Sequence, residues 1–196
     1  LSFAVVKGLA EHTTACMNDE TCDALVVTGA GKMFVAGADI REFNMTRPDD
    51  VPEFHDLMKV IEEGSKPIVA AVNGIAFGGG LELAMGCHYR IIAPGALVGQ
   101  PEVKLGIIPG AGGTQRLPRL AGVETALDMI VGGDPVRAEK AVELGIADEL
   151  AGEDLLARAV AYALEKVADG PRPTGGITSR LGVVDPKYFE EYRLKI

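Results

Sequence analysis

Residues 67–84 read PIVAAVNGIAFGGGLELA, and the class of fold can be inferred from this stretch. After the proline, the apolar run over residues 68–72 predicts a buried strand. Asn73-Gly74 marks a turn. Three glycines then lead into a segment that predicts a helix over about residues 80–87. A strand that runs through a glycine turn into a helix start is the kind of unit from which α/β proteins are built.

The same alternation of strand and helix patterns continues on both sides of this stretch. Strands are predicted over residues 24–27 and 89–93, and helices over residues 2–18, 51–63, 113–120, 123–131, 137–144 and 153–168. Strands that alternate with helices predict an α/β fold with covered sheets. We expect a core over residues 1–170. Over residues 171–196 the pattern weakens into a C-terminal tail with polar turns and a short amphipathic end.

Composition limits the function classes that need consideration. The chain has 196 residues, enough for one domain with a sizeable core, and an ordinary globular content of 47% hydrophobic and 24% charged residues. Its net charge of −9 argues against general nucleic-acid binding, which needs a basic face. No apolar run approaches the roughly 20 residues that span a bilayer, so we expect neither a nucleic acid nor a membrane as partner.

The cysteines and histidines predict no metal site. Cys16, Cys22 and Cys87 form an odd, scattered set that matches neither a zinc spacing nor a disulfide framework. The three histidines lie far apart, and His88 is expected to be packed at the start of a strand. A reducing compartment, hence a cytoplasmic location, is the expectation that follows from this cysteine pattern.

Three glycine-rich segments are candidates for binding a ligand. The first, residues 29–40, follows a strand, and its small residues let a ligand approach the backbone closely. The second, residues 73–84, places free backbone N–H groups at a helix start, where they could hold a developing oxyanion. The third covers residues 99–102 and 106–117. None of the three matches the spacing and context of a P-loop or a dinucleotide fingerprint.

Two glutamates are the candidates for proton transfer. Glu82 lies among apolar residues, where a carboxylate is costly unless it is paired or has a task, and Glu102 lies in a Pro-Glu turn between apolar stretches. Two partly buried carboxylates could hold one water and exchange a proton. Simpler interpretations stay open: a helix-start carboxylate for Glu82, a surface turn residue for Glu102, an N-cap for Asp39, and solvated charges for Lys32 and Arg41.

Taken together, the three segments resemble the enoyl-CoA hydratase/isomerase (crotonase) family over about residues 1–150. The resemblance is densest over residues 34–43, 67–93 and 100–122. It implies a crotonase-like spiral of short β-sheets, made of ββα units and surrounded by helices. It also implies the hydration of a trans-2-enoyl-CoA to a 3-hydroxyacyl-CoA, as in fatty-acid β-oxidation. No metal or redox cofactor is implied, because coenzyme A arrives as part of the substrate.

The resemblance assigns roles to individual residues. The backbone N–H groups of Ala38 and Gly79 would form an oxyanion hole for the thioester carbonyl. Glu82 and Glu102 would bind a water between them and share the acid–base work, and the N–H of Gly110 would help to hold that water. Which glutamate is the acid and which the base stays open, because two coupled acids titrate as a pair.

Coenzyme A would bind along the first glycine-rich segment. The resemblance implies that Ala36, Asp39 and Ile40 border the adenine and pantetheine, and that Lys32 and Arg41 reach the phosphates. The wall of the acyl pocket would depend on scattered apolar side chains: Met33, Phe43, Leu57 and Met85.

Alternative functions stay open at this point. One is Δ3,Δ2-enoyl-CoA isomerisation, or the hydratase part of a bifunctional hydratase/3-hydroxyacyl-CoA dehydrogenase. Another is a non-catalytic acyl-CoA-binding subunit, against which the presence of both glutamates speaks. The family usually has further strands before the point where this chain begins, so we expect those strands to lie outside it. The resemblance also implies a homotrimer or hexamer.

Overall fold

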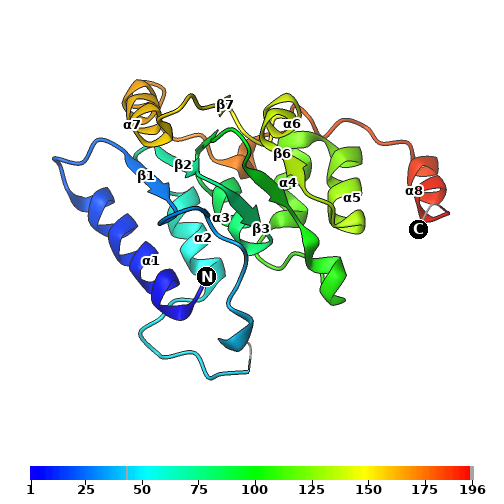
Figure 1. Cartoon of the computed structure of the whole chain (residues 1–196), viewed down its shortest axis with the longest axis horizontal. Coiled ribbons are helices and arrows are strands. Elements are labelled where there is room, and N and C mark those ends of the chain that lie inside the picture. Colours follow the sequence, from blue (N-terminus) through cyan, green and yellow to red (C-terminus); the bar gives the residue numbers. More distant parts are fainter. Residues whose placement is uncertain (43, 195–196) are drawn as a thin grey trace.

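The structure is a computed structural model that describes residues 1–42 and 44–194. Its centre consists of two small sheets (Figure 1). The larger sheet has the strand order β1-β2-β4-β7 and is parallel throughout, with β1 at Leu25–Thr28, β2 at Ile68–Val72, β4 at Tyr89–Ile92 and β7 at Glu149–Leu150. The smaller sheet has the order β3-β5-β6, with β3 at Ile75–Phe77, β5 at Leu97–Gly99 and β6 at Val136–Arg137.

Helices surround the two sheets (Figure 1). They are α1 (Phe3–Asn18), α2 (Phe54–Glu62), α3 (Gly79–Gly86), α4 (Gly113–Ala121), α5 (Val123–Gly132), α6 (Ala138–Glu143), α7 (Leu155–Glu165) and α8 (Pro186–Arg193). The described residues also contain short 3-10 turns: η1 (Ile40–Glu42), η2 (Pro101–Leu105) and η3 (Thr174–Gly176). Each helix that the sequence predicts is present within a few residues of its expected bounds. The sequence did not predict four of the strands: β3, β5, β6 and β7. Each has only two or three residues, too few to show the alternation of apolar and polar residues that predicts a strand.

Strand β2 forms the centre of the core because both of its faces are covered. Its side chains alternate: Ile68, Ala70 and Val72 belong to the apolar cluster that contains α2 and α3, whereas Val69 and Ala71 pack with residues of α7. All five residues of the strand are buried. This explains why the strand is a continuous apolar run rather than an alternating one.

The prediction of which side chains line the acyl pocket is partly wrong. Leu57 and Met85 are fully buried in the core between α2 and α3, and neither lines the ligand pocket described below. Met33 is half exposed and does not line that pocket either. Phe43 lies outside the described residues. Helical packing explains the error, because an apolar residue on a helix serves the core as readily as a binding site.

The first two glycine-rich segments are joined by backbone and side-chain contacts. Val35 pairs with β3: its N–H donates to the Ile75 carbonyl at 3.0 Å, and the Phe77 N–H donates to the Val35 carbonyl at 3.0 Å. A Cβ added to Gly80 would lie 2.0 Å from the Val35 carbonyl oxygen. Only a glycine at position 80 therefore lets α3 begin against this segment.

The prediction that the cysteines form no disulfide is wrong for one pair. Cys16, in the last turn of α1, forms a disulfide with Cys22, while Cys87 is a free, buried thiol whose pKa is raised to about 12 by burial. The chain turns back after α1 and brings the two Cα atoms to 5.5 Å, a proximity that sequence spacing does not reveal. The cytoplasmic location inferred from the cysteine pattern stays a prediction and has lost this support.

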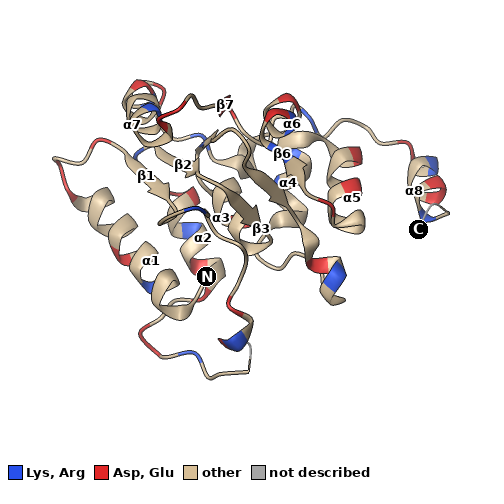
Figure 2. Cartoon of the chain, viewed as in Figure 1, with Lys and Arg blue, Asp and Glu red and all other residues tan. Residues whose placement is uncertain are grey.

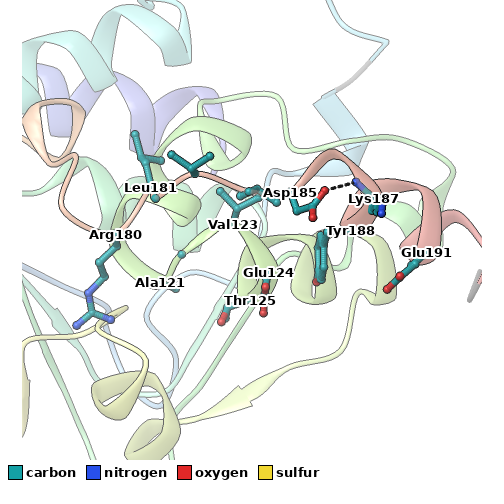
Figure 3. Close-up of a pocket in the computed structure, with 14 residues that line it drawn as sticks. Ala121, Val123, Glu124, Thr125, Arg180, Leu181, Asp185, Lys187, Tyr188 and Glu191 are labelled. Atoms are coloured by element: carbon teal, nitrogen blue, oxygen red, sulfur yellow. Dashed lines mark hydrogen bonds between the residues drawn. The ribbon is translucent and has the colours of Figure 1, made fainter.

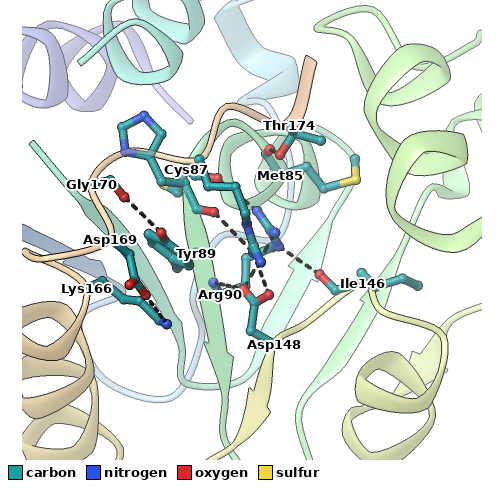
Figure 4. Close-up of polar contacts among 12 residues, drawn as sticks. Met85, Cys87, Tyr89, Arg90, Ile146, Asp148, Lys166, Asp169, Gly170 and Thr174 are labelled. Carbon is teal, nitrogen blue, oxygen red and sulfur yellow. Dashed lines mark hydrogen bonds and ion pairs between the residues drawn. The ribbon is translucent and has the colours of Figure 1, made fainter. Parts of the chain in front are cut away.

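A buried cluster around Arg90 joins β4 to later parts of the chain (Figure 4). The Arg90 guanidinium donates to the carbonyls of Ile146 (2.9 Å) and Cys87 (2.8 Å) and lies 3.6 Å from the Asp148 carboxylate. Farther along, the Thr174 hydroxyl is fully buried and donates to the Met85 carbonyl at 2.7 Å. Residues just after 170 thus contact the core, and the boundary expected near residue 170 stays a prediction.

The outer surface mixes both signs of charge along the peripheral helices (Figure 2). Arg158 on α7 pairs with Glu149 and Glu165, and Lys140 on α6 pairs with Glu143. Of the helices that the structure describes, none combines the length and apolar character needed to cross a membrane.

Candidate active site

A pocket of about 490 Å³ lies where the glycine-rich segments meet, a volume in the usual range for small-molecule sites. Its wall is formed by the loop before η1, the start of α3, the turn η2 and the loop that precedes α4. The lining residues are Ala36, Gly37, Ala38, Ile40, Glu53, Phe54, His55, Phe77, Gly78, Gly79, Glu82, Pro101, Glu102, Leu105, Ile107, Ile108, Gly110 and Ala111.

Two backbone N–H groups form one part of this wall. A Cβ added to Gly79 would lie 3.8 Å from the Ala38 nitrogen, so the two peptide groups are neighbours. Neither N–H donates a hydrogen bond to any residue that the structure describes. The preceding residues, Gly37 (φ +132°) and Gly78 (φ +52°), have backbone conformations that favour glycine. The turn at Gly78 also makes Gly79 the first residue of α3, at the positive end of the helix dipole.

Glu82 lies in the first turn of α3 and is 3% exposed. Its Oε1 accepts hydrogen bonds from the Ala111 N–H at 2.7 Å and the Gly113 N–H at 2.8 Å. Burial raises the pKa of this carboxyl, while the two N–H donors and the charge of Arg116 act in the opposite direction. A Cβ added to Gly113 would lie 3.0 Å from this oxygen, so a glycine is needed for the close approach.

Glu102 lies in η2 and is 8% exposed, so its interpretation as a surface turn residue is wrong. A Cβ added to Gly78 would lie 3.0 Å from its Oε1, which places the carboxylate beside the turn before Gly79. The nitrogen and oxygen of the Gln100 side-chain amide are assigned from the groups that surround them. In this assignment the amide nitrogen donates to both carboxylate oxygens of Glu102, at 2.8 and 3.0 Å. Burial, and then the charge of Glu82, raise the pKa of Glu102.

The pocket therefore combines two kinds of group. Two free backbone donors can stabilise negative charge that develops on a bound oxygen. Two buried carboxylates with raised pKa values can take and deliver a proton, and the charge of Glu82 contributes to the raised pKa of Glu102. Gly110 also lines the pocket, and its N–H has no acceptor among the described residues.

The residues expected along coenzyme A divide into two groups. Ala36 and Ile40 line the pocket, and Asp39 borders an adjoining cavity of about 310 Å³. Arg41 is bound to Asp39, with Nη2 2.6 Å from Oδ2, and this contact lowers the pKa of the Asp39 carboxyl to about 2. The N-cap interpretation of Asp39 also holds locally, because its Oδ1 accepts from the Arg41 N–H at 3.1 Å. Lys32 is exposed and lines neither cavity.

Several residues that contribute to the site were not predicted from the sequence. The N–H groups of Ala111 and Gly113 hold Glu82, and Gln100 contacts Glu102. A glycine-rich run directly before a helix was a usable signal for the first pair, because such runs expose backbone donors. Phe54 and His55, on α2, gave no signal, since they reach the pocket only through the packing of that helix.

A second, larger cavity of about 640 Å³ lies between the start of α5 and the segment that leads into α8 (Figure 3). Its charged lining residues include Glu124, Arg180, Asp185 and Lys187. It contains neither of the buried glutamates and neither of the two donors, so we place the candidate site at the smaller pocket. Within the part of the chain that the structure describes, no group of three or more His, Cys, Asp and Glu side chains could hold a metal ion.

Backbone donors beside two buried carboxylates, on a parallel sheet and a smaller mixed sheet surrounded by helices, define an acid–base site for a substrate with a carbonyl to polarise. The chain belongs to the enoyl-CoA hydratase/isomerase family, whose family model matches residues 1–175. The expected crotonase-like fold is thereby confirmed, because enoyl-CoA hydratases are also its structural neighbours.

The similar proteins include separate and multifunctional enzymes. The human peroxisomal bifunctional enzyme is 45% identical over 171 residues, which are 87% of this chain and 23% of that protein. A probable enoyl-CoA hydratase of Bacillus subtilis (strain 168) is 43% identical over 151 residues, or 74% of this chain and 58% of that protein. The crystal structure of an enoyl-CoA hydratase from Bacillus anthracis superposes with a TM-score of 0.77 at 38% identity, covering 86% of this chain and 67% of the other. This chain thus spans about a quarter of the human relative's length.

Proposed function

We propose that the chain hydrates trans-2-enoyl-CoA to 3-hydroxyacyl-CoA. The observation that carries the proposal is that two buried glutamates, Glu82 and Glu102, line the same pocket as the free backbone donors of Ala38 and Gly79. Relatives named enoyl-CoA hydratase at 43% and 38% identity support the same reaction. Coenzyme A is part of the substrate, and the chemistry requires no further cofactor.

The oxyanion donors act on the thioester. Its carbonyl oxygen accepts from the N–H groups of Ala38 and Gly79, which withdraws electron density from C3 of the conjugated enoyl group. Negative charge grows on this oxygen as the C3–O bond forms, and the dipole of α3 stabilises it at Gly79. One such donor typically contributes roughly 2.7–4 kcal/mol to transition-state stabilisation.

The glutamates handle the protons. A water bound between Glu82 and Glu102 gives one proton to an ionised carboxylate as its oxygen attacks C3. The protonated carboxyl of the pair delivers a proton to C2, so that the elements of one water molecule are added. The raised pKa values of both groups favour a pair that holds one proton between them. The free N–H of Gly110 is a further donor for this water.

The rest of the substrate extends along the first glycine-rich segment. Ala36 and Ile40 border the pantetheine arm in this proposal, and Asp39 lies toward the adenine. Lys32 and Arg41 reach the phosphates only if their exposed side chains move toward the ligand, since neither lines the pocket or the adjoining cavity. A homotrimer or hexamer stays part of the proposal, to be tested by light scattering.

A hydration assay tests the reaction. The purified chain is mixed with crotonoyl-CoA, and loss of the conjugated thioester absorbance is followed for wild type, Glu82→Gln and Glu102→Gln. Each substitution is expected to lower turnover by on the order of 10²–10⁴, because one of the two proton-transfer groups is lost. Glu143→Gln, which changes an exposed glutamate on α6, serves as the control and keeps wild-type turnover.

Two outcomes would contradict the proposal. Wild-type turnover in both pocket variants would remove the glutamates from the chemistry. If 3-enoyl-CoA were converted to 2-enoyl-CoA while crotonoyl-CoA stayed unhydrated, the reaction would be double-bond isomerisation, which moves a proton along the acyl chain and adds no water.

A further inference from the structure

Arg116, on α4, contacts the loop that holds Glu82. The Arg116 Nη1 donates to the Ala111 carbonyl at 2.9 Å. The backbone N–H of Ala111 in turn donates to Glu82 Oε1 at 2.7 Å. One residue of backbone therefore links the guanidinium to the carboxylate. Gly112 (φ +96°) makes this contact possible, because a Cβ at that position would lie 2.2 Å from Arg116 Nη1.

Glu62, the last residue of α2, holds the other side of the guanidinium. Its Oε2 accepts from Arg116 Nη2 at 2.6 Å, and its Oε1 accepts from the Gly175 N–H at 2.6 Å. The Glu62 backbone carbonyl lies 3.2 Å from His88 Nε2, and His88 Nδ1 accepts from the Ile68 N–H, so the imidazole donates to this carbonyl. Glu62 is thus positioned by contacts with three parts of the chain.

The ion pair is shielded from water. The Arg116 side chain is 11% exposed and that of Glu62 is 19% exposed. A planar guanidinium that binds a carbonyl and a carboxylate at once sets the orientation of both, which a single ammonium group does not do. The pair therefore restrains the loop more strongly than an exposed ion pair would.

We propose that Arg116, held by Glu62, is a positioning residue: it fixes the loop at Ala111–Gly113 so that its two N–H groups keep the Glu82 carboxylate in its catalytic place. This inference deepens the proposed hydration and rests on it. It assigns Arg116 no contact with substrate.

The charged groups around the pair determine the direction of the expected effects. Arg116 faces Glu62 and Glu82, as well as the neutral thiol of Cys87. Glu82 faces Arg116 and Glu102. Burial raises the pKa of Glu82, and the positive charge of Arg116 lowers it. Loss of that charge, together with displacement of the N–H donors, is therefore expected to raise the pKa of Glu82 further.

A purely structural role is the competing explanation, because Glu62 also binds the segment at Gly175. Arg119 provides a matched control for that role. It lies on the same helix, and its Nη1 donates to the Ile177 carbonyl at 3.3 Å, so it anchors the same segment of the chain. In the described residues it makes no hydrogen bond to the loop at Ala111–Gly113.

The test compares Arg116→Gln with Arg119→Gln in the full chain. Two experiments are made. Steady-state kinetics give kcat and KM for crotonoyl-CoA hydration, and ¹³C NMR of glutamate-labelled protein, with Glu82→Gln for assignment, gives the pKa of Glu82. Arg116→Gln is expected to lower kcat by on the order of 10²-fold with KM near wild type, and to raise the pKa of Glu82. Arg119→Gln is expected to leave both at wild-type values.

Arg116→Lys is a second variant that tests the same inference if Arg116→Gln fails to fold. Lysine retains the charge but cannot bind the Ala111 carbonyl and Glu62 together, so kcat falls while the pKa of Glu82 stays closer to wild type. Wild-type kcat and pKa in a folded Arg116 variant overturn the inference, as does an equal loss in Arg119→Gln. If wild type hydrates no enoyl-CoA, the proposed function fails. The NMR titration then still decides whether Arg116 positions Glu82.

Discussion

At the residue scale, Glu82 and Glu102 are held in a state that costs stability. Burial raises the pKa of both carboxyls in the folded protein. A group with a raised folded pKa contributes stability that is present below its unfolded value and is lost as pH rises through the folded pKa. At neutral pH these two side chains therefore weaken the fold that positions them, as is common where function competes with stability.

Glu102→Gln is accordingly expected to increase the free energy of unfolding at pH 7 by roughly 0.5–2 kcal/mol, even though it lowers turnover. The gain should shrink below the ordinary glutamate pKa of 4.5, where the wild-type carboxyl is protonated too. Urea unfolding at pH 7 and pH 4 measures both values. The exposed Glu143→Gln variant should show no such gain, and a clear destabilisation of Glu102→Gln at pH 7 would refute the prediction.

At the element scale, the position of α3 determines the geometry of the oxyanion donors. The helix begins directly against Val35, and a Cβ on Gly80 would lie 2.0 Å from the Val35 carbonyl oxygen. Since Gly79 supplies one donor and Glu82 lies in the first turn of the same helix, any shift of α3 moves both groups at once.

Gly80→Ala should therefore lower stability by about 1–3 kcal/mol through overpacking and reduce kcat at the same time. Gly132→Ala is the matched control: this glycine ends α5 and has open space where the Cβ would lie. It should leave kcat unchanged and alter stability by about 1 kcal/mol or less, toward greater stability. Thermal unfolding and the crotonoyl-CoA assay provide the two readouts, and equal behaviour of the two variants would argue against the prediction.

At the scale of the whole molecule, the segment after Gly170 is fastened to the core before α8 begins. The Thr174 hydroxyl donates to the Met85 carbonyl, and Arg172 binds Asp148 with an N–O distance of 2.5 Å. By contrast, α8 contains no buried residue among those that the structure describes and lies at the edge of the molecule (Figure 1).

Truncation after Asp185 is thus expected to change the melting temperature little, whereas truncation after Gly170 should cost about 3 kcal/mol or more, because it removes the partners of several buried polar groups. Thermal unfolding of both truncated chains measures the difference. If both truncations were equally harmless, the core would end near residue 170, as the weakening sequence pattern after that residue predicts.

Local patterns along the chain were enough to predict the α/β class, the approximate bounds of the helices, and the central strand at residues 68–72. These patterns of apolar residues and glycines reflect backbone preferences and burial, which act over short stretches of chain. The same stretch pointed to Glu82, since a carboxylate among core residues signals a task. The three glycine-rich segments, taken together, also made the family recognisable from the amino-acid sequence alone.

How the site is held depends instead on tertiary contacts. The strands β3, β5, β6 and β7 exist because distant segments pair, and their two or three residues carry no signal of their own. In the same way, the Cys16–Cys22 disulfide, the N–H donors to Glu82 from a loop 29 and 31 residues away, and the Glu62–Arg116 pair depend on which parts of the chain meet. The physical reason is that these contacts arise only once the apolar core has closed, and residue order along the chain does not specify proximity in space.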